Sequence, residues 1–269
     1  MLKEMLGSLM VQVEILAVGD ELCYGRVYDT NSFWLADQIT QLGGIVHRIT
    51  CIRDDSEEIC TVLNEILSRK PRFIFITGGL GPTEDDRTIE GLSKFTGRRI
   101  VTDQRVLNIL AERRKLHPSQ LLPGHIKMAS TLEGVECLPN PVGVAPLTII
   151  RMGETAIFTM PGPPREVQGC FTTYLAKEIQ DVTHYCSLAK RLIVTMVEAE
   201  VAPLLSQVLK AVPGVYLKSL VGGYVPNVGL PIEIITFDND EEGCQRKYKE
   251  TLRMFEELVN QKGKKIVES

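Results

Sequence analysis

Apolar runs alternate with amphipathic segments along the first two-thirds of the chain. Residues 13–18 (VEILAV) and Ile45–Ile52 have the pattern of buried strands, and Phe73–Thr77 (FIFIT) is almost wholly apolar, as is typical of a central parallel strand. Between them, apolar residues recur at helical spacing over Thr30–Gln41 and after Ser56, which we expect to cap the second helix. Strand–helix alternation requires right-handed crossovers, so the pattern predicts an α/β fold with a doubly wound, mainly parallel sheet.

Further segments complete this first domain. Helical spacing near residues 88–95 and 103–115 predicts two more helices, followed by a polar loop rich in proline and glycine. Two short apolar runs, at residues 147–151 and 156–159, flank a Gly-containing turn and predict a hairpin. The prolines of residues 161–164 then start a helix that runs to about Ile179.

The pattern changes near residues 182–187, which predicts a domain boundary between Asp181 and Leu188. The rest of the chain has the order strand, helix, strand, strand, helix. We expect these elements at residues 191–196, 200–211, 216–221, 231–237 and 241–260. The sequence therefore predicts an α/β domain at residues 11–182 and a second, smaller α+β domain of βαββα order at 186–265.

The densest cluster of glycine and carboxylate residues directly follows the FIFIT run, at residues 77–88 (TGGLGPTEDDRT). Glycines in this cluster would let backbone amides approach a phosphate, and a helix beginning near Asp86 or Thr88 would add free donors and a partial positive charge. The alternative is a tight turn in which Asp86 only caps the helix, although a cap does not account for three consecutive carboxylates. The spacing matches neither GxxxxGK[ST] nor GxGxxG, so it predicts neither a P-loop NTPase nor a dinucleotide dehydrogenase.

Other polar clusters occupy the ends of predicted strands and the starts of helices. One runs from Gly19 to Asn31, a second is Asp54-Asp55, and a third combines residues 140–146 with 161–166. Asp29, Thr30 or the Asp54-Asp55 pair could also be ordinary helix caps. The first two clusters, like residues 77–88, follow a predicted parallel strand, and such strand ends share one edge of the sheet. Carboxylates from three loops could therefore gather there around a hard divalent cation, which prefers oxygen ligands.

Composition argues against several classes of protein. The 269 residues are 44% hydrophobic and 24% charged, as in globular domains, and the formal net charge of −4 argues against binding along a nucleic-acid backbone. No apolar stretch approaches the roughly 20 residues that cross a bilayer, so we expect a cytoplasmic protein. The seven cysteines contain no CxxC pair, the four histidines lack ligand spacing, and no serine has a GxSxG setting.

Four stretches together resemble the N-terminal domain of the CinA family, which shares the molybdopterin-binding fold of the MogA and MoaB proteins. They are residues 19–31 (GDELCYGRVYDTN), 77–88, 140–146 (NPVGVAP) and 161–166 (PGPPRE). The βαββα tail also resembles the small domain that follows in CinA proteins. One departure is Leu147, where the family usually has glycine. Full-length CinA proteins add a domain that deamidates nicotinamide mononucleotide; this activity is not expected here, because that domain would begin where the chain ends.

The resemblance implies a metal-dependent pyrophosphatase that acts on ADP-ribose or a related nucleotide diphosphate. It implies a divalent metal (Mg²⁺, Mn²⁺ or Co²⁺) held by Asp85 and Asp86, with potassium as a further ion. Asp86, Asp54 and Glu21 are the expected catalytic residues, with either Asp54 or Glu21 orienting the attacking water. The expected ligand-binding residues are Gly19, Asp20, Asp29, Asn31, Thr77, Gly78, Gly79, Gly81, Thr83, Thr88, Asn140, Gly143, Pro161, Gly162 and Glu166. The expected partner is a small-molecule nucleotide or pterin bound to a homodimer, with no nucleic acid and no membrane.

Two other functions stay open on the sequence alone. The MogA branch binds molybdopterin and adenylylates it, so a molybdopterin-binding or adenylylating protein without hydrolysis is the main alternative. RNA binding by the C-terminal domain would require a KH-like fold, whose GxxG loop between paired helices this tail lacks.

Overall fold

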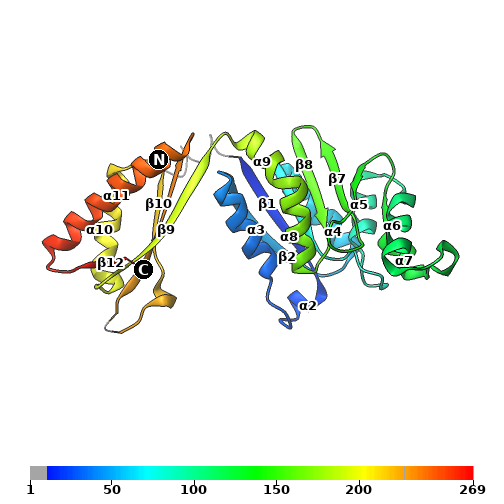
Figure 1. Cartoon of the computed structure of the whole chain (residues 1–269), viewed down its shortest axis with the longest axis horizontal. Coiled ribbons are helices and arrows are strands. Elements are labelled where there is room, and N and C mark those ends of the chain that lie inside the picture. The colour runs from blue at the N-terminus through cyan, green and yellow to red at the C-terminus, as the bar shows by residue number, and fades with distance from the viewer. Residues whose placement is uncertain (1–10, 227, 269) are drawn as a thin grey trace. The chain divides into compact units, whose positions relative to one another are not determined.

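The computed structural model describes residues 11–268 except residue 227 (Figure 1). Two compact units divide the described chain. Residues 11–39 and 45–179 form the first, and residues 40–44 and 180–268 form the second. The main division, after Ile179, lies just before the boundary expected between Asp181 and Leu188.

The first unit is built around a six-stranded sheet of order β2-β1-β3-β8-β7-β6, in which β2, β1, β3 and β8 are parallel and β7 and β6 antiparallel. This confirms the doubly wound, mainly parallel α/β fold. Its elements are β1 (Gln12–Val18), α2 (Asp20–Cys23), α3 (Thr30–Gln41), β2 (Ile45–Ile52), α4 (Ser56–Ser68), β3 (Phe73–Thr77), α5 (Thr88–Thr96), β4 (Ile100–Thr102), α6 (Gln104–Arg114), η1 (Pro118–Gln120), α7 (Pro123–Met128), β5 (Ser130–Leu132), β6 (Glu136–Leu138), β7 (Leu147–Met152), β8 (Thr155–Met160), α8 (Pro164–Cys170), η2 (Phe171–Leu175) and α9 (Ala176–Thr183).

Helices cover both faces of this sheet, which explains why all five residues of β3 are buried. On one face, Leu16 and Ile74 share a core with Ile59 and Leu63 of α4 and with Leu92 of α5. On the other face lie α3 and the long helix α8–η2–α9, whose middle is a π-helical turn. A strand buried on both sides needs apolar residues at every position, and the FIFIT run supplies them.

Aromatic packing fixes the long helix against the sheet. The ring centroids of Phe75 and Phe171 lie 6.0 Å apart, and Trp34 of α3 meets Phe171 edge-on at 5.3 Å. Such pairs add about 0.5–1.5 kcal/mol beyond the burial of their area. The middle of the long helix, where α8 passes into η2, is thereby held against the sheet and α3.

Two local sequence predictions are wrong. Ser56 is the first residue of α4 rather than its cap, because the Asp55 carboxylate accepts the backbone hydrogen bonds of Glu57 and Glu58 at 2.8 and 2.9 Å. The polar loop expected before the hairpin contains α7 and the short strands β5 and β6, and β5 pairs with β4. These elements are three to six residues long, too short for periodicity to identify.

The second unit has a four-stranded antiparallel sheet of order β10-β11-β9-β12. The βαββα order is confirmed, with β9 starting five residues before the expected strand and β12 added beyond the expected end. The elements are β9 (Cys186–Val194), α10 (Glu198–Ala211), β10 (Val215–Ser219), η3 (Val221–Gly223), β11 (Leu230–Asp238), α11 (Glu241–Gln261) and β12 (Ile266–Glu268). Phe255 and Val259 of α11 are fully buried in a hydrophobic core that belongs to the second unit alone. A separate core is typical of a domain.

Within the described residues, every helix is either too short or too polar to cross a membrane.

We expect limited proteolysis of the native protein to cut first between Asp181 and Leu188 and to leave both units intact. The reason is that each unit has its own core, while α9 ends and β9 begins within this segment. Mass spectrometry of the early fragments checks the position of the cut. Initial cleavage inside residues 71–86 would contradict the division.

Candidate functional site

The loop after β3 requires glycine at two consecutive positions. Gly78 and Gly79 have φ angles of 95° and 62°, in the left-handed region that favours glycine. A Cβ atom on Gly78 would lie 2.1 Å from the carbonyl oxygen of Val18, and one on Gly79 would lie 2.2 Å from Oγ1 of Thr88. The buried Thr88 in turn donates from Oγ1 to the carbonyl oxygen of Gly78 at 2.9 Å. The chain therefore turns sharply at the edge of the sheet.

Asp86 organises the next part of this loop. Its carboxylate accepts hydrogen bonds from the backbone amides of Gly81 at 2.8 Å and Thr83 at 2.9 Å, and also from the Thr83 hydroxyl. Helix α5 begins at Thr88, and its N-cap is Arg87, which makes no side-chain cap bond. The alternative in which Asp86 caps the helix is thus wrong; Asp86 ties residues 81–83 into a compact loop.

The glycine amides differ from the expected phosphate cradle. The amide of Gly78 donates to the carbonyl oxygen of Met160 at 3.1 Å, and the amide of Gly81 donates to Asp86. These two donors are therefore already engaged, which corrects the expectation that three amides face a ligand. The amide of Gly79 makes no hydrogen bond within the part of the chain that the structure describes.

An acidic cleft of about 350 Å³ lies at the carboxyl edge of the sheet. Four segments that are far apart in the sequence meet there, from residues 18–31, 54, 77–86 and 162–164, and the side-chain amide of Asn31 donates to the carbonyl oxygen of Gly162 at 2.7 Å. The residues expected from the sequence that line the cleft are Gly19, Asp20, Glu21, Asp29, Asn31, Asp54, Thr77, Gly78, Gly79, Gly81, Thr83, Asp85, Asp86 and Gly162. The sequence reasoning missed Leu22, Val27, Tyr28 and Leu80, which also line it.

Five expected ligand-binding residues do not line the cleft: Thr88, Asn140, Gly143, Pro161 and Glu166. Asn140 and Glu166 hold the loop between β6 and β7 instead. The buried Asn140 amide donates to Glu166 at 2.6 Å, and its oxygen accepts from the amide of Gly143 at 2.7 Å. Burial raises the pKa of the Glu166 carboxyl above its ordinary value, while Asn140 opposes this. These contacts give the NPVGVAP stretch a structural role.

Two of the clustered carboxylates already have partners. Asp20 accepts from the Arg53 guanidinium at 2.9 and 3.1 Å, and this contact lowers the pKa of Asp20. Asp29 accepts from the backbone amide of Ser32 at 2.9 Å, at the start of α3, as expected of a helix cap. Asp29 is therefore an ordinary helix cap, although it also lines the cleft.

Asp54 has the most perturbed environment in the cleft. Its Oδ2 accepts from the backbone amide of Asp20 at 3.0 Å, but its Oδ1 is buried and has no hydrogen-bond partner in the described structure. Burial raises the pKa of Asp54 to about 6, and the negative charges of Asp86, Glu21 and Asp20 act in the same direction. A buried acceptor without a donor is costly, so a proton or a cation at this oxygen would relieve that cost.

No three side chains of His, Cys, Asp or Glu among the described residues are close enough together to hold a metal ion by themselves. The carboxylates from three loops do share the cleft, as expected, but as a loose group. Asp85 is exposed, and the Thr83 hydroxyl lowers its pKa. Any cation bound here would need water or a ligand to complete its coordination.

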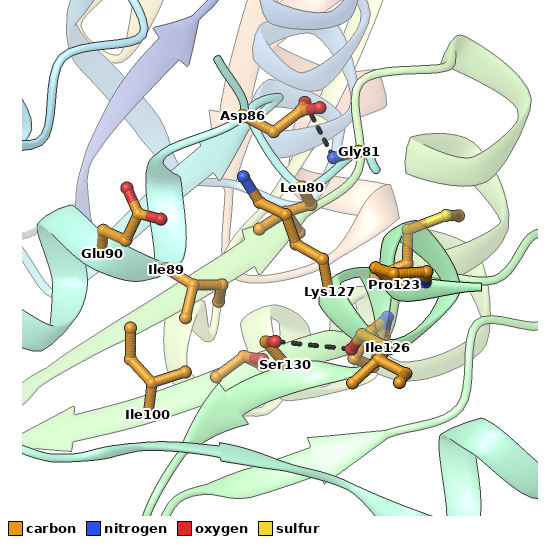
Figure 2. A pocket seen from close by; sticks show the side chains of 14 residues that line it. Leu80, Gly81, Asp86, Ile89, Glu90, Ile100, Pro123, Ile126, Lys127 and Ser130 are labelled. Atoms are coloured by element: carbon orange, nitrogen blue, oxygen red, sulfur yellow. Dashed lines mark hydrogen bonds between the residues drawn. The ribbon is translucent and has the colours of Figure 1, made fainter. Parts of the chain in front are cut away.

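A second, mainly apolar cavity of about 320 Å³ adjoins the same loop (Figure 2). Ile89 and Ile100 face it from one side, and Pro123 and Ile126 of the α7 segment from the other. Its remaining lining comes from residues 79–81 and from Asp86, Glu90, Lys127, Met128, Ser130, Pro146 and Thr148. The sequence prediction missed this cavity because its wall is made by the short elements that were expected to be a loop.

Comparison with known proteins agrees with this geometry. Residues 14–181 match the family model of the "probable molybdopterin binding domain", which is more than half of the chain. The chain belongs to this family. A protein of Metallosphaera sedula is 35% identical over 78% of this chain and 80% of its own length, and one of Thermococcus kodakarensis is 36% identical over 85% and 91%.

Among solved structures, the protein CinA of Thermoplasma acidophilum, itself described as having unknown function, is similar to this chain. It is 29% identical, with a TM-score of 0.59, and the match covers 63% of this chain and 98% of that one. The resemblance to CinA, stated from four sequence stretches, is thus confirmed over most of the first unit. The acidic cleft and the apolar cavity both lie within residues 14–181, which match the family model.

We expect Asp54→Asn to raise the thermal stability of the metal-free protein at neutral pH. In the native protein the pKa of Asp54 is raised from 3.8 to about 6. Above that pH the native protein carries a charge that burial disfavours, and below it the native protein binds more protons than the unfolded chain does. The advantage of asparagine should therefore be complete above about pH 6 and vanish near pH 4. We expect a rise in Tm of roughly 2–4 °C, which corresponds to about 1 kcal/mol in a protein of this size. Calorimetric scans with a chelator check this, and equal Tm values at pH 8 would contradict it.

Proposed function

We propose that the protein hydrolyses the phosphoanhydride bond of ADP-ribose or a related nucleotide diphosphate, in a metal-dependent reaction at the acidic cleft. The observation that carries the proposal is the buried, unpaired Oδ1 of Asp54 among the neighbouring carboxylates. Carboxylates crowded at a sheet edge without enough counter-charge favour a cation, and a bound cation in turn attracts a phosphate.

The donor set fits a hard divalent cation. Mg²⁺ commonly uses only one or two protein carboxylates, with waters and substrate phosphates as its other ligands, so a loose carboxylate group is compatible with it. Asp54 and Asp85 would hold the ion, because Oδ1 of Asp54 is unpaired and Asp85 is exposed at the cleft. Asp86 fits less well than the sequence suggested, since donors from Gly81 and Thr83 occupy both its oxygens. Such a metal polarises a phosphoryl group and increases the acidity of bound water.

The protein's own groups would position the ligand and accept a proton. Glu21, which also lines the cleft, is the base that we propose for the attacking water, because Oδ1 of Asp54 would be occupied by the ion. The amide of Gly79 would donate to a phosphate oxygen, and Asp86 would keep the loop in position for it.

Molybdopterin binding or adenylylation is the second candidate, favoured by the family match and by the apolar cavity beside the cleft. Molybdopterin carries a flat pterin ring and a phosphate, and the two hollows could receive one each. The homodimer and the potassium ion expected from the sequence remain part of the pyrophosphatase proposal; sedimentation and ion replacement test them. A fluorescent pterin released from purified protein would favour this second candidate over ADP-ribose.

Nucleotide and metal binding should be mutually dependent. The carboxylates of the cleft repel a diphosphate unless a cation lies between them, so the affinity for ADP-ribose should rise at least tenfold when Mg²⁺ or Mn²⁺ is added. Calorimetry with and without a chelator measures this. Equal affinity under both conditions would rule out the proposed site.

Asp86→Ala should lose most nucleotide binding and turnover while the protein remains folded. The variant removes the hydrogen bonds that hold Gly81 and Thr83, at a cost of about 1 kcal/mol for each net bond against a stability of roughly 5–15 kcal/mol. The matched control is Asp103→Ala, which removes a helix cap that accepts from Arg105 outside both hollows. If Asp86→Ala turns over every nucleotide diphosphate as fast as this control does, the loop that Asp86 holds has no role in nucleotide binding or turnover.

A further inference from the structure

The apolar cavity and the acidic cleft share one wall. Gly79, Leu80, Gly81 and Asp86 line both, so the tied loop of residues 79–86 has the cleft on one side and the cavity on the other. The two hollows therefore adjoin, and a ligand with a phosphate in the cleft and a ring in the cavity would have to extend past this single loop.

The size and lining of the cavity suit a flat ring. Its volume of about 320 Å³ lies at the lower end of the roughly 300–1,000 Å³ typical of small-molecule pockets. The side chains of Ile89, Ile100 and Ile126 surround it (Figure 2), and such apolar walls favour the faces of an aromatic heterocycle over a sugar or phosphate. The polar remainder of the ligand would lie in the cleft.

Most polar groups of the cavity already have partners. Lys127 donates from Nζ to the carbonyl oxygen of Thr83 at 2.5 Å. The Ser130 hydroxyl donates to the carbonyl oxygen of Ile126 at 3.5 Å (Figure 2). Thr148 shares a hydrogen bond with Thr131. The Glu90 carboxylate, in the first turn of α5, differs: it has neither a hydrogen bond nor an ion pair in the part of the chain that the structure describes.

We propose that this cavity is the subsite for a fused nitrogen heterocycle with an amino-oxo edge, and that Glu90 selects that edge. An ionised carboxylate only accepts hydrogen bonds, and its two oxygens can accept two parallel ones. The amino-oxo edge of guanine or of a pterin presents two adjacent N–H donors. Adenine presents one amino donor beside a ring acceptor, which faces the second oxygen of Glu90 unfavourably.

This inference rests on the proposed function and narrows its substrate. Within the nucleotide diphosphates, one that carries guanine should bind more tightly than ADP-ribose. A pterin phosphate offers the same edge, so the two sources share the chemistry that Glu90 recognises. Binding of GMP and of a free pterin distinguishes them. Binding of the free pterin would favour a pterin ligand, whereas binding of GMP without the free pterin would favour a guanine nucleotide.

The test measures the affinities of the full chain for GMP, AMP and pterin by calorimetry, with Mg²⁺ present. We expect GMP to bind roughly tenfold or more tightly than AMP, as for a hydrogen bond to a charged group. Glu90→Gln should reverse or abolish this preference, because glutamine offers one acceptor and one donor and so complements adenine. Ile126→Trp, which narrows the cavity, should weaken the binding of all three rings.

The matched control is Glu112→Gln, which removes the same charge from the exposed surface of α6 and should change nothing. Equal affinities for GMP and AMP, an unchanged ratio in Glu90→Gln, or no binding of any ring would overturn the inference. Hydrolysis of a nucleotide diphosphate alongside any of these results would leave the proposed function standing. Ring selection through Glu90 in a protein that hydrolyses no nucleotide diphosphate would support the ring subsite and contradict the proposed hydrolysis.

Discussion

The hydrogen bonds that Asp86 accepts are the constraint on which the rest of the site depends. A single carboxylate binds the amides of Gly81 and Thr83, in a segment that has no regular secondary structure of its own. A loop without such a tie loses the entropy of its free backbone when it is ordered, about 1–2 kcal/mol per residue. These bonds close within the loop, and from the cavity side Lys127 adds one more, to the carbonyl oxygen of Thr83. The loop therefore keeps its shape between the two hollows.

The acidic cleft shows a conflict between stability and function. Asp54 keeps one oxygen buried and unpaired, and the charges of Asp86 and Glu21 add to the effect of burial in raising its pKa. An oxygen of this kind destabilises the ligand-free protein, and folding alone offers no reason to keep it. Functional sites are where such costs are retained. Asp20 differs because Arg53 neutralises it, so the uncompensated charge is concentrated on Asp54.

The sequence predicted the regular parts of the fold well, and the site only in part. Strand β3 could be predicted because its sequence is almost wholly apolar, and all five of its residues are buried. The parallel arrangement then predicted that the loops that follow β1, β2 and β3 lie along one edge of the sheet. The roles of single side chains were less predictable, because Asp86 and Asp55 both precede helices and only Asp55 caps one. Asn140 and Glu166 bind each other, a long-range contact that local pattern cannot reveal. The apolar cavity was missed since its wall comes from elements too short to show a period.

The two halves of the site thus have different origins in the fold. The cleft is made by the ends of parallel strands, a position that the topology of any doubly wound sheet provides for a ligand. The cavity is made by α7 and the short strands β4 and β5, inserted between β3 and the hairpin strands β7 and β8. Apart from Ile89, which packs against the core of the parallel strands, its apolar side chains lie outside that part of the core and can change without disturbing those strands. In the proposed site, phosphate anchoring would therefore depend on the fold, whereas the choice of ring would depend on the insertion and on Glu90 at its border.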